Sequence, residues 1–386
     1  MIPRTLAAQV EKSRNTFPIL SITGPRQAGK TTLVQDLFSE YGYFNLEALD
    51  VRSIAETDPR RFIMDHIERG MVLDEAQRVP ALFNYLQPIV DESRLMGKVV
   101  LTGSQHFLLL ESVTQSLAGR VMLHELLPFT VRELPHALSE RIDHILFRGM
   151  YPPLHDREID PLQFYPTYIQ TYVERDVRLV RNIGDLSAFS RFLRLCAGRI
   201  GGLLNMSSLA VEAGIDHKTV RSWLSVLEAS FIVFFLQPYH RNFNKRLVKQ
   251  PKLYFYDTGL ACSLLGLDAE DRLFSHYLRG GIFENFVVAE LRKMRLHRGS
   301  RPAMYFWRDN SGTEVDLIVE RAGEISAVEI KSGATFNDEW SRSLEKFGKY
   351  SGVDTNRRHI VYGGDSSFAG SRIWSWRDML ALDELL

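Results

Sequence analysis

A chain of 386 residues is long enough for two or three domains. Hydrophobic residues make up 45% and charged residues 24%, which is ordinary for a soluble globular protein, and no apolar run approaches the 18 residues that would predict a membrane span. Lys and Arg together number 47, as do Asp and Glu, so the overall charge gives no sign of a nucleic-acid partner and any DNA surface must be a local basic patch.

The first 20 residues lack the apolar segment and the small-residue cleavage site of a signal peptide. The two cysteines, Cys196 and Cys262, stand in apolar surroundings without metal-binding spacing. These features predict a cytoplasmic protein without a membrane association, whose cysteines are core residues.

In residues 1–135, short apolar runs alternate with amphipathic helical patterns. This alternation predicts an α/β domain, in which a parallel sheet is covered by helices. The expected strands are 17–24, 71–76 and 98–104, the clearest expected helix is 31–41, and residues 123–134 close the domain.

Three further parts are predicted downstream. Residues 136–185 are expected to form a helical lid or linker, with 165–180 as the clearest amphipathic segment. In residues 186–250, a helix, a Gly-containing turn, a second helix and a strand-like run predict a winged helix-turn-helix. Residues 251–386 are expected to form an α/β domain of mixed order, with helices at 281–296 and 338–349 and strands at 303–307, 313–320, 325–331 and 359–363.

GPRQAGKT, residues 24–31, follows a predicted strand and precedes a predicted helix, and it has the G-x-x-x-x-G-K-[ST] spacing of a phosphate-binding loop. Its backbone amides and the helix N-terminus favour a bound phosphate. Lys30 is expected to reach the β- and γ-phosphates of ATP, and the Thr31 hydroxyl to ligate Mg²⁺. The alternative is a chance match that binds no nucleotide. The predicted nucleotide contacts are Gly24, Pro25, Arg26, Gln27, Ala28, Gly29, Lys30, Thr31, Thr32 and Ser104.

MVLDEAQ, residues 71–77, ends an apolar run with two carboxylates. Asp74 is placed to hold the Mg²⁺ shell, and Glu75 to act as the base that orients the attacking water. Either residue alone could simply cap a strand. Together with the loop some 45 residues earlier, they predict a site for ATP hydrolysis.

Two further positions are expected to act on the γ-phosphate. Ser104 or Gln105, after the strand 98–104, is placed to sense it, or is simply a solvated strand end. Arg120, after Gly119 on a short turn, is a candidate arginine finger acting from a neighbouring subunit, which predicts a homo-oligomer. The alternative for Arg120 is an ordinary surface arginine.

TGPRQAGKTTL, MVLDEAQ, LTGSQ and LAGRV resemble segments of the bacterial and archaeal AAA-type ATPases that carry a C-terminal domain of unknown function, DUF4143. YFYDTGLACSLLG, GIFENFVVAEL, YFWRDNSGTEVDLIV and VEIKSG resemble segments of that second domain. The resemblance covers nearly the whole chain. It implies ATP binding with Mg²⁺, a winged helix and a nuclease-like terminal fold, while leaving the cellular role open.

In the predicted winged helix, Lys218, Thr219 and Arg221 lie near the start of the second helix, where a recognition helix contacts DNA. Basic residues there would supply salt-dependent affinity. Trp223, Leu224 and Leu227 would pack the helix on its domain in any case. The alternatives are therefore a DNA-binding module and a protein-docking module with a solvated polar face.

TEVDLIVERAGEISAVEIKSG, residues 313–333, places a carboxylate and a Glu-x-Lys pattern on two apolar runs. On paired strands, Asp316, Glu329 and Lys331 are expected to share a face, and Glu284 in the preceding helix can add a carboxylate. Such oxygens suit Mg²⁺ or Mn²⁺, and Lys331 is a candidate for handling water at a scissile phosphate.

These four residues resemble the PD-(D/E)xK nucleases, and their layout is similar to that of archaeal Holliday-junction resolvases. The resemblance implies a restriction-nuclease-like fold and a second Mg²⁺ or Mn²⁺ if the site is active. Charges that merely pair on exposed strands are the alternative, and such a fold can also survive as a binding surface. The sequence thus predicts an ATPase that binds, remodels or cuts branched or foreign DNA. It leaves open an ATP-controlled switch that only binds partners, or a signalling ATPase with a protein ligand.

Overall fold

The structure is a computed structural model, and it describes residues 2–103, 117–177, 183–239, 248–301, 303–368 and 370–386. The chain forms two compact units. The first comprises Met1–Phe129, Ala229–Phe231 and Leu296–Ser300, and the second comprises Thr130–Glu228, Ile232–Arg295 and Arg301–Leu386.

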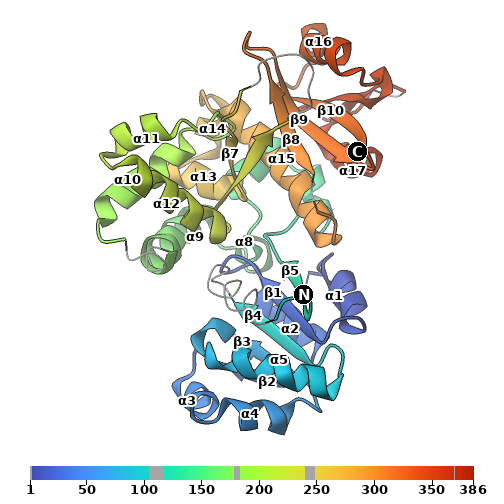
Figure 1. Ribbon diagram of the computed structural model, residues 1–386. Helices are drawn as coiled ribbons and strands as arrows, with labels where there is room; N and C mark the ends of the chain where they lie inside the picture. Colours follow the sequence, from blue (N-terminus) through green and yellow to red (C-terminus); the bar gives the residue numbers. More distant parts are fainter. Residues whose placement is uncertain (1, 104–116, 178–182, 240–247, 302, 369) are drawn as a thin grey trace. The chain divides into compact units, whose positions relative to one another are not determined.

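The first unit is built on a parallel five-stranded sheet in the order β2-β3-β4-β1-β5. This confirms the predicted α/β class and parallel sheet, in which β1 lies between β4 and β5 (Figure 1). β2 and β5 lie at the edges and had not been expected. The strands are β1 (Ile19–Thr23), β2 (Gly42–Asn45), β3 (Met71–Asp74), β4 (Val99–Gly103) and β5 (Val121–Glu125).

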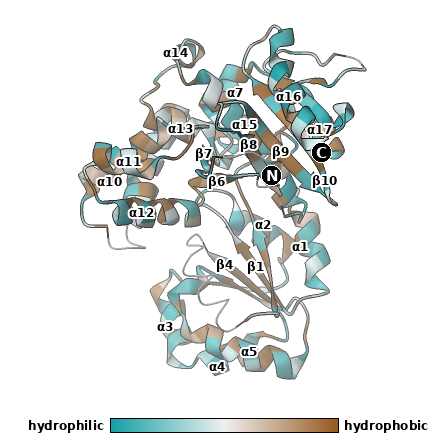
Figure 2. Ribbon diagram, turned by 45° about the horizontal axis from the view of Figure 1, so that its top comes forward, coloured by the Kyte–Doolittle hydropathy of each residue, from teal (hydrophilic) through white to brown (hydrophobic). Residues whose placement is uncertain are grey.

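Two apolar cores cover the two faces of this sheet. Side chains of β1 alternate between them, since Ile19 joins one core and Leu20 and Ile22 join the other. Figure 2 shows β1 and β4 as mainly hydrophobic. The helices α1 (Ala7–Arg14) and α2 (Lys30–Leu37) contribute to one core, and α3 (Leu49–Thr57), α4 (Pro59–His66) and α5 (Ala81–Ser93) contribute to the other.

The second unit contains most of the remaining helices. Its helices are α7 (Ile142–Arg148), α8 (Pro152–Asp156), α9 (Pro161–Tyr168), α10 (Leu186–Ala197), α11 (Met206–Ala213), α12 (His217–Ala229), α13 (Thr258–Leu264), α14 (Glu270–Phe274), α15 (Arg279–His297), α16 (Arg342–Ser351) and α17 (Met379–Leu385). The predicted amphipathic helix 165–180 is not one regular helix, because α9 is followed by a π-helical segment, Ile169–Val177. Short 3₁₀ turns span Ala76–Arg78, Pro135–Ser139, Asp338–Ser341, Thr355–Arg357 and Trp376–Asp378.

A seven-stranded sheet in the order β12-β11-β10-β9-β8-β6-β7 crosses the second unit. Parallel and antiparallel pairs are mixed, as the sequence predicted for the C-terminal part. α16 packs through Leu344 and Phe347 on a core that includes Trp307 and Ile318. The strands are β6 (Val233–Pro238), β7 (Lys252–Phe255), β8 (Met304–Arg308), β9 (Glu314–Arg321), β10 (Glu324–Lys331), β11 (Arg358–Tyr362) and β12 (Ile373–Ser375).

β9 contains one extra residue relative to β8. Tyr305 pairs with Ile318 but Trp307 pairs with Val315, so two steps along β8 correspond to three along β9. Such a bulge exchanges the faces of the strand on either side of it. Val315 and Ile318 therefore both join the core beneath α16, although they are three residues apart.

Two predictions concern the environment of the chain. Within the described residues, no helix combines the length and apolar character needed to cross a membrane. Cys196 and Cys262 are both buried and free, as expected for core residues.

Candidate functional site

The loop between β1 and α2 has the backbone of a phosphate-binding loop. Gly24 (φ 153°) and Gly29 (φ 90°) occupy the region that favours glycine. A Cβ on Gly24 would lie 2.0 Å from the carbonyl oxygen of Leu126, so a side chain cannot fit there. α2 begins at Lys30, directly after Gly29, which points the free N–H groups of its first turn toward the loop.

Lys30 is buried in the loop, with 8% of its surface exposed. Its ammonium donates hydrogen bonds to the carbonyl oxygens of Gly24 and Pro25, each at 2.9 Å. Burial lowers the pKa of Lys30 to about 8, although the carboxylates of Glu75 and Asp74 oppose the shift. The ammonium is thus held by neutral oxygens, in a position where a phosphate anion would stabilise its charge.

The rest of the loop is held by contacts on both sides. Arg4 donates to the carbonyl oxygens of Ala28 and Leu127, each at 2.6 Å, and so ties the loop to the segment after β5. Arg26, a predicted nucleotide contact, lies 3.5 Å from Glu47. Gln27 adopts φ 65°, and Thr32 is exposed on the first turn of α2.

Asp74, at the end of β3, is the centre of a hydroxyl cluster. The Thr31 hydroxyl donates to Asp74 Oδ2 at 3.1 Å, the Tyr43 hydroxyl donates to the same oxygen, and the Thr102 hydroxyl donates to Oδ1. Thr31 and Asp74, predicted from separate motifs, are therefore brought together. Because a hydroxyl and a carboxylate oxygen are ligands that Mg²⁺ prefers, these residues fit the cation of a nucleotide–magnesium complex.

Glu75 follows Asp74 in a left-handed backbone conformation, φ 55°. Its carboxylate accepts a hydrogen bond from the Gln77 amide at 2.5 Å. A left-handed glutamate is uncommon and is often found where backbone geometry serves a site. Gln77, which the sequence analysis did not single out, fixes the carboxylate that the base role requires.

The remaining nucleotide-site predictions divide into two cases. Ser104 and the alternative Gln105 lie outside the described residues. Arg120 forms a two-pronged ion pair with Asp91 of α5, with Nε–Oδ1 at 2.6 Å and Nη2–Oδ2 at 2.7 Å. This arginine is thus held on its own subunit in the structure, and its action on a neighbouring subunit stays a prediction.

The three predicted DNA contacts lie on the first turns of α12. Lys218 and Arg221 are exposed, whereas the Thr219 hydroxyl donates to Asp216 Oδ2 at 2.6 Å. Thr219 N also donates to Asp216 Oδ1, so the Asp216 side chain caps the start of the helix. α10, α11 and α12 are followed by the antiparallel pair β6–β7. Trp223 and the leucines of α12 are buried, as expected from the sequence.

The four predicted residues of the C-terminal part also converge. Lys331 Nζ lies 2.6 Å from Glu329 Oε1 and 3.9 Å from Asp316 Oδ2. Glu284 of α15 joins them through a residue that the sequence analysis missed, Lys252 of β7. Glu284, Glu314, Asp316 and Glu329 are called the acidic cluster below.

Lys252 is buried at the centre of this site, with 2% of its surface exposed. Its ammonium lies 2.7 Å from Glu284 Oε1, 2.5 Å from Glu314 Oε1 and 3.8 Å from Asp316 Oδ1. The Tyr254 hydroxyl, two residues along β7, also donates to Glu284 Oε1 at 2.6 Å. The alternation of KLYF could have placed Lys252 and Tyr254 on one face, but nothing local connects them with Glu284, 32 residues away.

Protonation equilibria in the cluster reflect crowded carboxylates. Burial raises the pKa of Glu284 to about 7, against the effect of Lys252. Burial is the largest cause that raises the pKa of Glu329 to about 8, and repulsion from Asp316 is the second. Burial opposes the charge on Lys252, but the surrounding acidic groups outweigh it and raise its pKa well above the ordinary value. Near neutral pH, the cluster is balanced by two lysines and by protons on its own carboxyl groups.

The predicted metal role of Glu284, Asp316 and Glu329 finds no matching geometry. Across the described ranges, no group of three or more His, Cys, Asp or Glu side chains is arranged to hold a metal ion. Lys252 lies between Glu284 and Asp316 and takes the oxygens that would turn toward a cation. As arranged, the acidic cluster does not fit a second Mg²⁺ or Mn²⁺.

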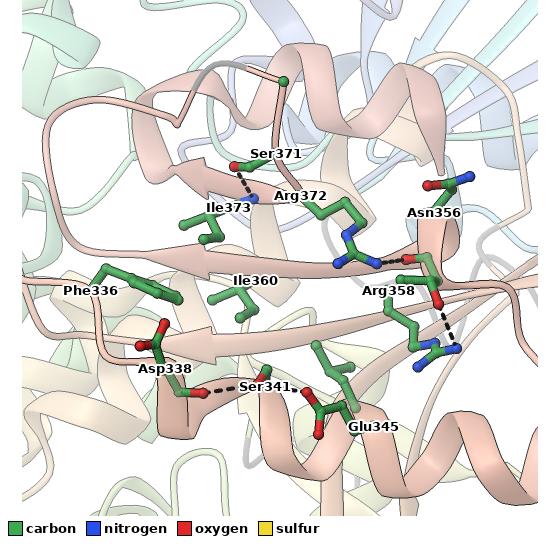
Figure 3. A pocket seen from close by; sticks show the side chains of 13 residues that line it. Phe336, Asp338, Ser341, Glu345, Asn356, Arg358, Ile360, Ser371, Arg372 and Ile373 are labelled. Atoms are coloured by element: carbon green, nitrogen blue, oxygen red, sulfur yellow. Dashed lines mark hydrogen bonds between the residues drawn. The ribbon is translucent and has the colours of Figure 1, made fainter.

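A separate cavity of about 720 Å³ opens beside α16 and β11 of the second unit (Figure 3). Ile360 and Ile373 contribute apolar side chains to it, and Phe336 lies at one end. Arg358 and Arg372 both donate to Thr355, through its hydroxyl at 3.0 Å and through its carbonyl oxygen. The residues that line this cavity do not include those of the acidic cluster or the phosphate loop.

Comparisons with known proteins agree with this arrangement. The AAA domain matches residues 16–135, a domain of unknown function (DUF8612) matches 139–271, and a second (DUF4143) matches 279–379. The uncharacterized proteins Mb2031c of Mycobacterium bovis and Rv2008c of Mycobacterium tuberculosis are each 30% identical over 367 residues, covering 95% of this chain and 81% of the relative. This chain belongs to their family.

The segment that matches the AAA domain contains the whole phosphate loop, Asp74 and Glu75. This match identifies the first unit as a P-loop ATPase domain. Lys252 falls in the DUF8612 match, whereas Glu284, Asp316 and Glu329 fall in the DUF4143 match. The acidic cluster is thus assembled from two matched segments. The Walker-type ATPase PABY2304 of Pyrococcus abyssi is similar over 68% of this chain and 96% of its own, at 14% identity and a TM-score of 0.44.

Proposed function

We propose that this protein hydrolyses ATP and that this hydrolysis controls its binding to DNA. The observation that carries the ATPase part is the meeting of Thr31 with Asp74 at 3.1 Å beside the buried Lys30. These residues come from two motifs some 40 positions apart, and their convergence is what Mg²⁺-dependent phosphoryl transfer requires.

Each residue has a distinct task in this proposal. Lys30 exchanges its carbonyl partners for the phosphates of the nucleotide and neutralises their charge. Thr31 and Asp74 would hold Mg²⁺, which would offset the charge that develops on the phosphates. Glu75, released from Gln77, orients the attacking water and accepts its proton.

Arg120 is proposed to complete the site of a neighbouring subunit. It must first leave Asp91, to which it is paired within its own chain. Replacing Arg120 with Ala should therefore reduce ATP hydrolysis without preventing assembly. Asp91→Asn is the matched control, because it removes the ion pair with Arg120 but leaves the arginine in place. Normal assembly with a wild-type rate in Arg120→Ala would remove the finger from the proposal.

DNA contact is proposed for Lys218 and Arg221, which project from the exposed first turns of α12. The order α10, α11, α12, β6 and β7 supports a winged helix-turn-helix, whose recognition helix enters the major groove. Thr219 is a weaker candidate because Asp216 already engages its hydroxyl.

The C-terminal part admits two functions that one experiment separates. Either it cleaves DNA as a nuclease-like domain, or it serves a switch in which it only binds DNA or protein. The engagement of the acidic cluster by Lys252 favours the switch. In the switch, Asp316→Ala leaves function intact and Lys30→Ala abolishes it.

The test measures ATP hydrolysis in Mg²⁺ with and without duplex, single-stranded and junction DNA, and examines the same samples for cleavage. The proposal predicts that DNA stimulates hydrolysis in the wild type but not in Lys218→Ala/Arg221→Ala. No response to any DNA would remove the DNA part. Cleavage lost in Asp316→Ala and Lys331→Ala would select the nuclease over the switch.

A further inference from the structure

Lys252 is held as a fixed charge rather than as a mobile surface lysine. Its backbone pairs with Leu236 in the antiparallel β6–β7 ladder and forms a bridge to Leu203 on its other side. The ammonium lies 5.7 Å from the centre of the Phe306 ring. Only 2% of its surface is exposed, so the charge is almost fully enclosed by its partners.

The contacts of Lys252 come from the elements that a metal ion would have to connect. Glu284 approaches from α15, and Glu314 and Asp316 approach from β9, next to its bulge. A hard cation in this place would need the same carboxylate oxygens, at the shorter distances of about 2.0–2.6 Å that Mg²⁺ and Ca²⁺ demand. Glu284 Oε1 is already engaged by both Lys252 and Tyr254.

Lys331 differs from Lys252 in position and exposure. One third of its side chain is exposed, and it pairs with Glu329 at the rim of the cluster. Glu329 Oε2 is buried without a hydrogen-bond partner within the described residues. Once the central position is vacated, this oxygen can therefore hold a further positive charge, provided that Glu329 loses its proton.

We propose that the ammonium of Lys252 is the resident cation of the acidic cluster, and that it excludes divalent metal ions from a place where the carboxylates would otherwise bind one. The cluster then serves as an internal ion-pair network that joins β7, β9 and α15. Its removal should convert the network into a metal site. The inference concerns the metal chemistry of the second unit and stands independently of ATP hydrolysis and DNA binding.

The experiment uses the full chain carrying Asp74→Asn, without nucleotide, so that the carboxylate proposed to hold Mg²⁺ at the nucleotide site does not contribute to metal binding. Free Mn²⁺ is followed by electron paramagnetic resonance as the protein is titrated. Adding Asp316→Asn to this parent protein should not change its Mn²⁺ binding, because the acidic cluster of the parent should bind none. Addition of Lys252→Met, or of Lys252→Gln, which keeps a hydrogen-bond donor, should create one site that binds at least roughly tenfold more tightly than the parent.

Two controls identify the source of any gain. Lys331→Met should create no such site, because its ammonium lies at the rim, and Asp316→Asn should abolish the site gained in Lys252→Met. A parent that already binds Mn²⁺ through Asp316 would overturn the proposal, as would folded Lys252 variants that gain no Mn²⁺. If both Lys252 variants fail to fold, the comparison of the parent with Asp316→Asn still decides whether the cluster admits the metal.

Discussion

Lys30 and Lys252 are both buried, yet their surroundings are electrostatically opposite. The Lys30 ammonium contacts two neutral carbonyl oxygens, and its pKa falls to about 8. The Lys252 ammonium contacts carboxylates, and its pKa rises well above the ordinary value. A buried cation that lacks an anion attracts one from solution, whereas a buried cation that has several repels other cations. The first arrangement suits phosphate binding, and the second suits a closed ion-pair network.

The strongest test of this comparison removes the charge at Lys30. Lys30→Ala should reduce the ATPase rate by roughly 10²-fold or more, because a phosphate-stabilising donor is lost from a buried site. Stability near neutral pH should not fall, since burial disfavours the charge of Lys30 and the ammonium contacts neutral oxygens. Steady-state ATP hydrolysis and thermal unfolding are measured together, with Lys12→Ala, at an exposed lysine of α1, as the control. An unchanged rate in Lys30→Ala would end the comparison.

The converse substitution acts on stability. Lys252→Met should lower the free energy of unfolding by about 3–5 kcal/mol, because it leaves buried carboxylates without their partner. ATP hydrolysis by protein that remains folded should be retained. Denaturant unfolding is the measurement, and Lys331→Met, with its partly exposed ammonium, should cost about 1 kcal/mol or less. Equal losses of unfolding free energy in Lys252→Met and Lys331→Met would show that the deeper burial of Lys252 does not increase its effect on stability.

The pH dependence of nucleotide affinity sharpens the comparison. Since the pKa of Lys30 is about 8 in the free protein, ATP binding should weaken above that pH, by at most tenfold per pH unit. Calorimetric titrations from pH 7 to 9.5 measure this, and Lys30→Ala should show no such dependence.

The same shift has a consequence for the nucleotide-free protein. Folding lowers the pKa of Lys30 from 10.5 to about 8, so between these values the unfolded chain binds more protons than the folded one. The contribution of Lys30 to stability therefore rises with pH across this window. A contribution that fell with pH, obtained by difference from Lys30→Ala, would contradict the sign.

Exposed cations provide the smallest expected effects. Lys218 and Arg221 remain in water, so Lys218→Ala and Arg221→Ala should leave stability and basal ATP hydrolysis nearly unchanged. Each substitution should make the plot of log affinity for DNA against log salt concentration less steep, by about 1 in slope. Fluorescence anisotropy at several salt concentrations measures the slope. Slopes that match the wild type would place the DNA contacts elsewhere or remove them.

The two sites also differ in how far the sequence predicted them. The phosphate loop is contiguous, so its glycines, Lys30 and Thr31 could be assigned from spacing alone, and the strand-end rule added Asp74. For the C-terminal part, the convergence of Glu284, Asp316, Glu329 and Lys331 was also expected from strand alternation and chain order. These predictions depend only on local periodicity and on the pairing of neighbouring strands.

What the sequence did not predict depends on long-range pairing. Lys252 reaches the cluster because β7 pairs with β6, and β6 pairs with β8 in one sheet. The bulge in β9 breaks the strict period of two on which the sequence analysis relied. β2, β5 and β12 are short edge strands with weak apolar signals, and the π-helical segment after α9 has the amphipathic pattern of an ordinary helix.

The extra residue in β9 has a consequence for comparing relatives. A relative that lacks one amino acid between Val315 and Ile318 would regain regular pairing with β8, and both residues would still face the core, now two positions apart. An alignment gap at this point would therefore mark the loss of the bulge, whereas a gap elsewhere in β9 would exchange the faces of the strand. Deleting Leu317 in this chain should consequently damage the second unit less than deleting a residue from a regularly paired part of β9.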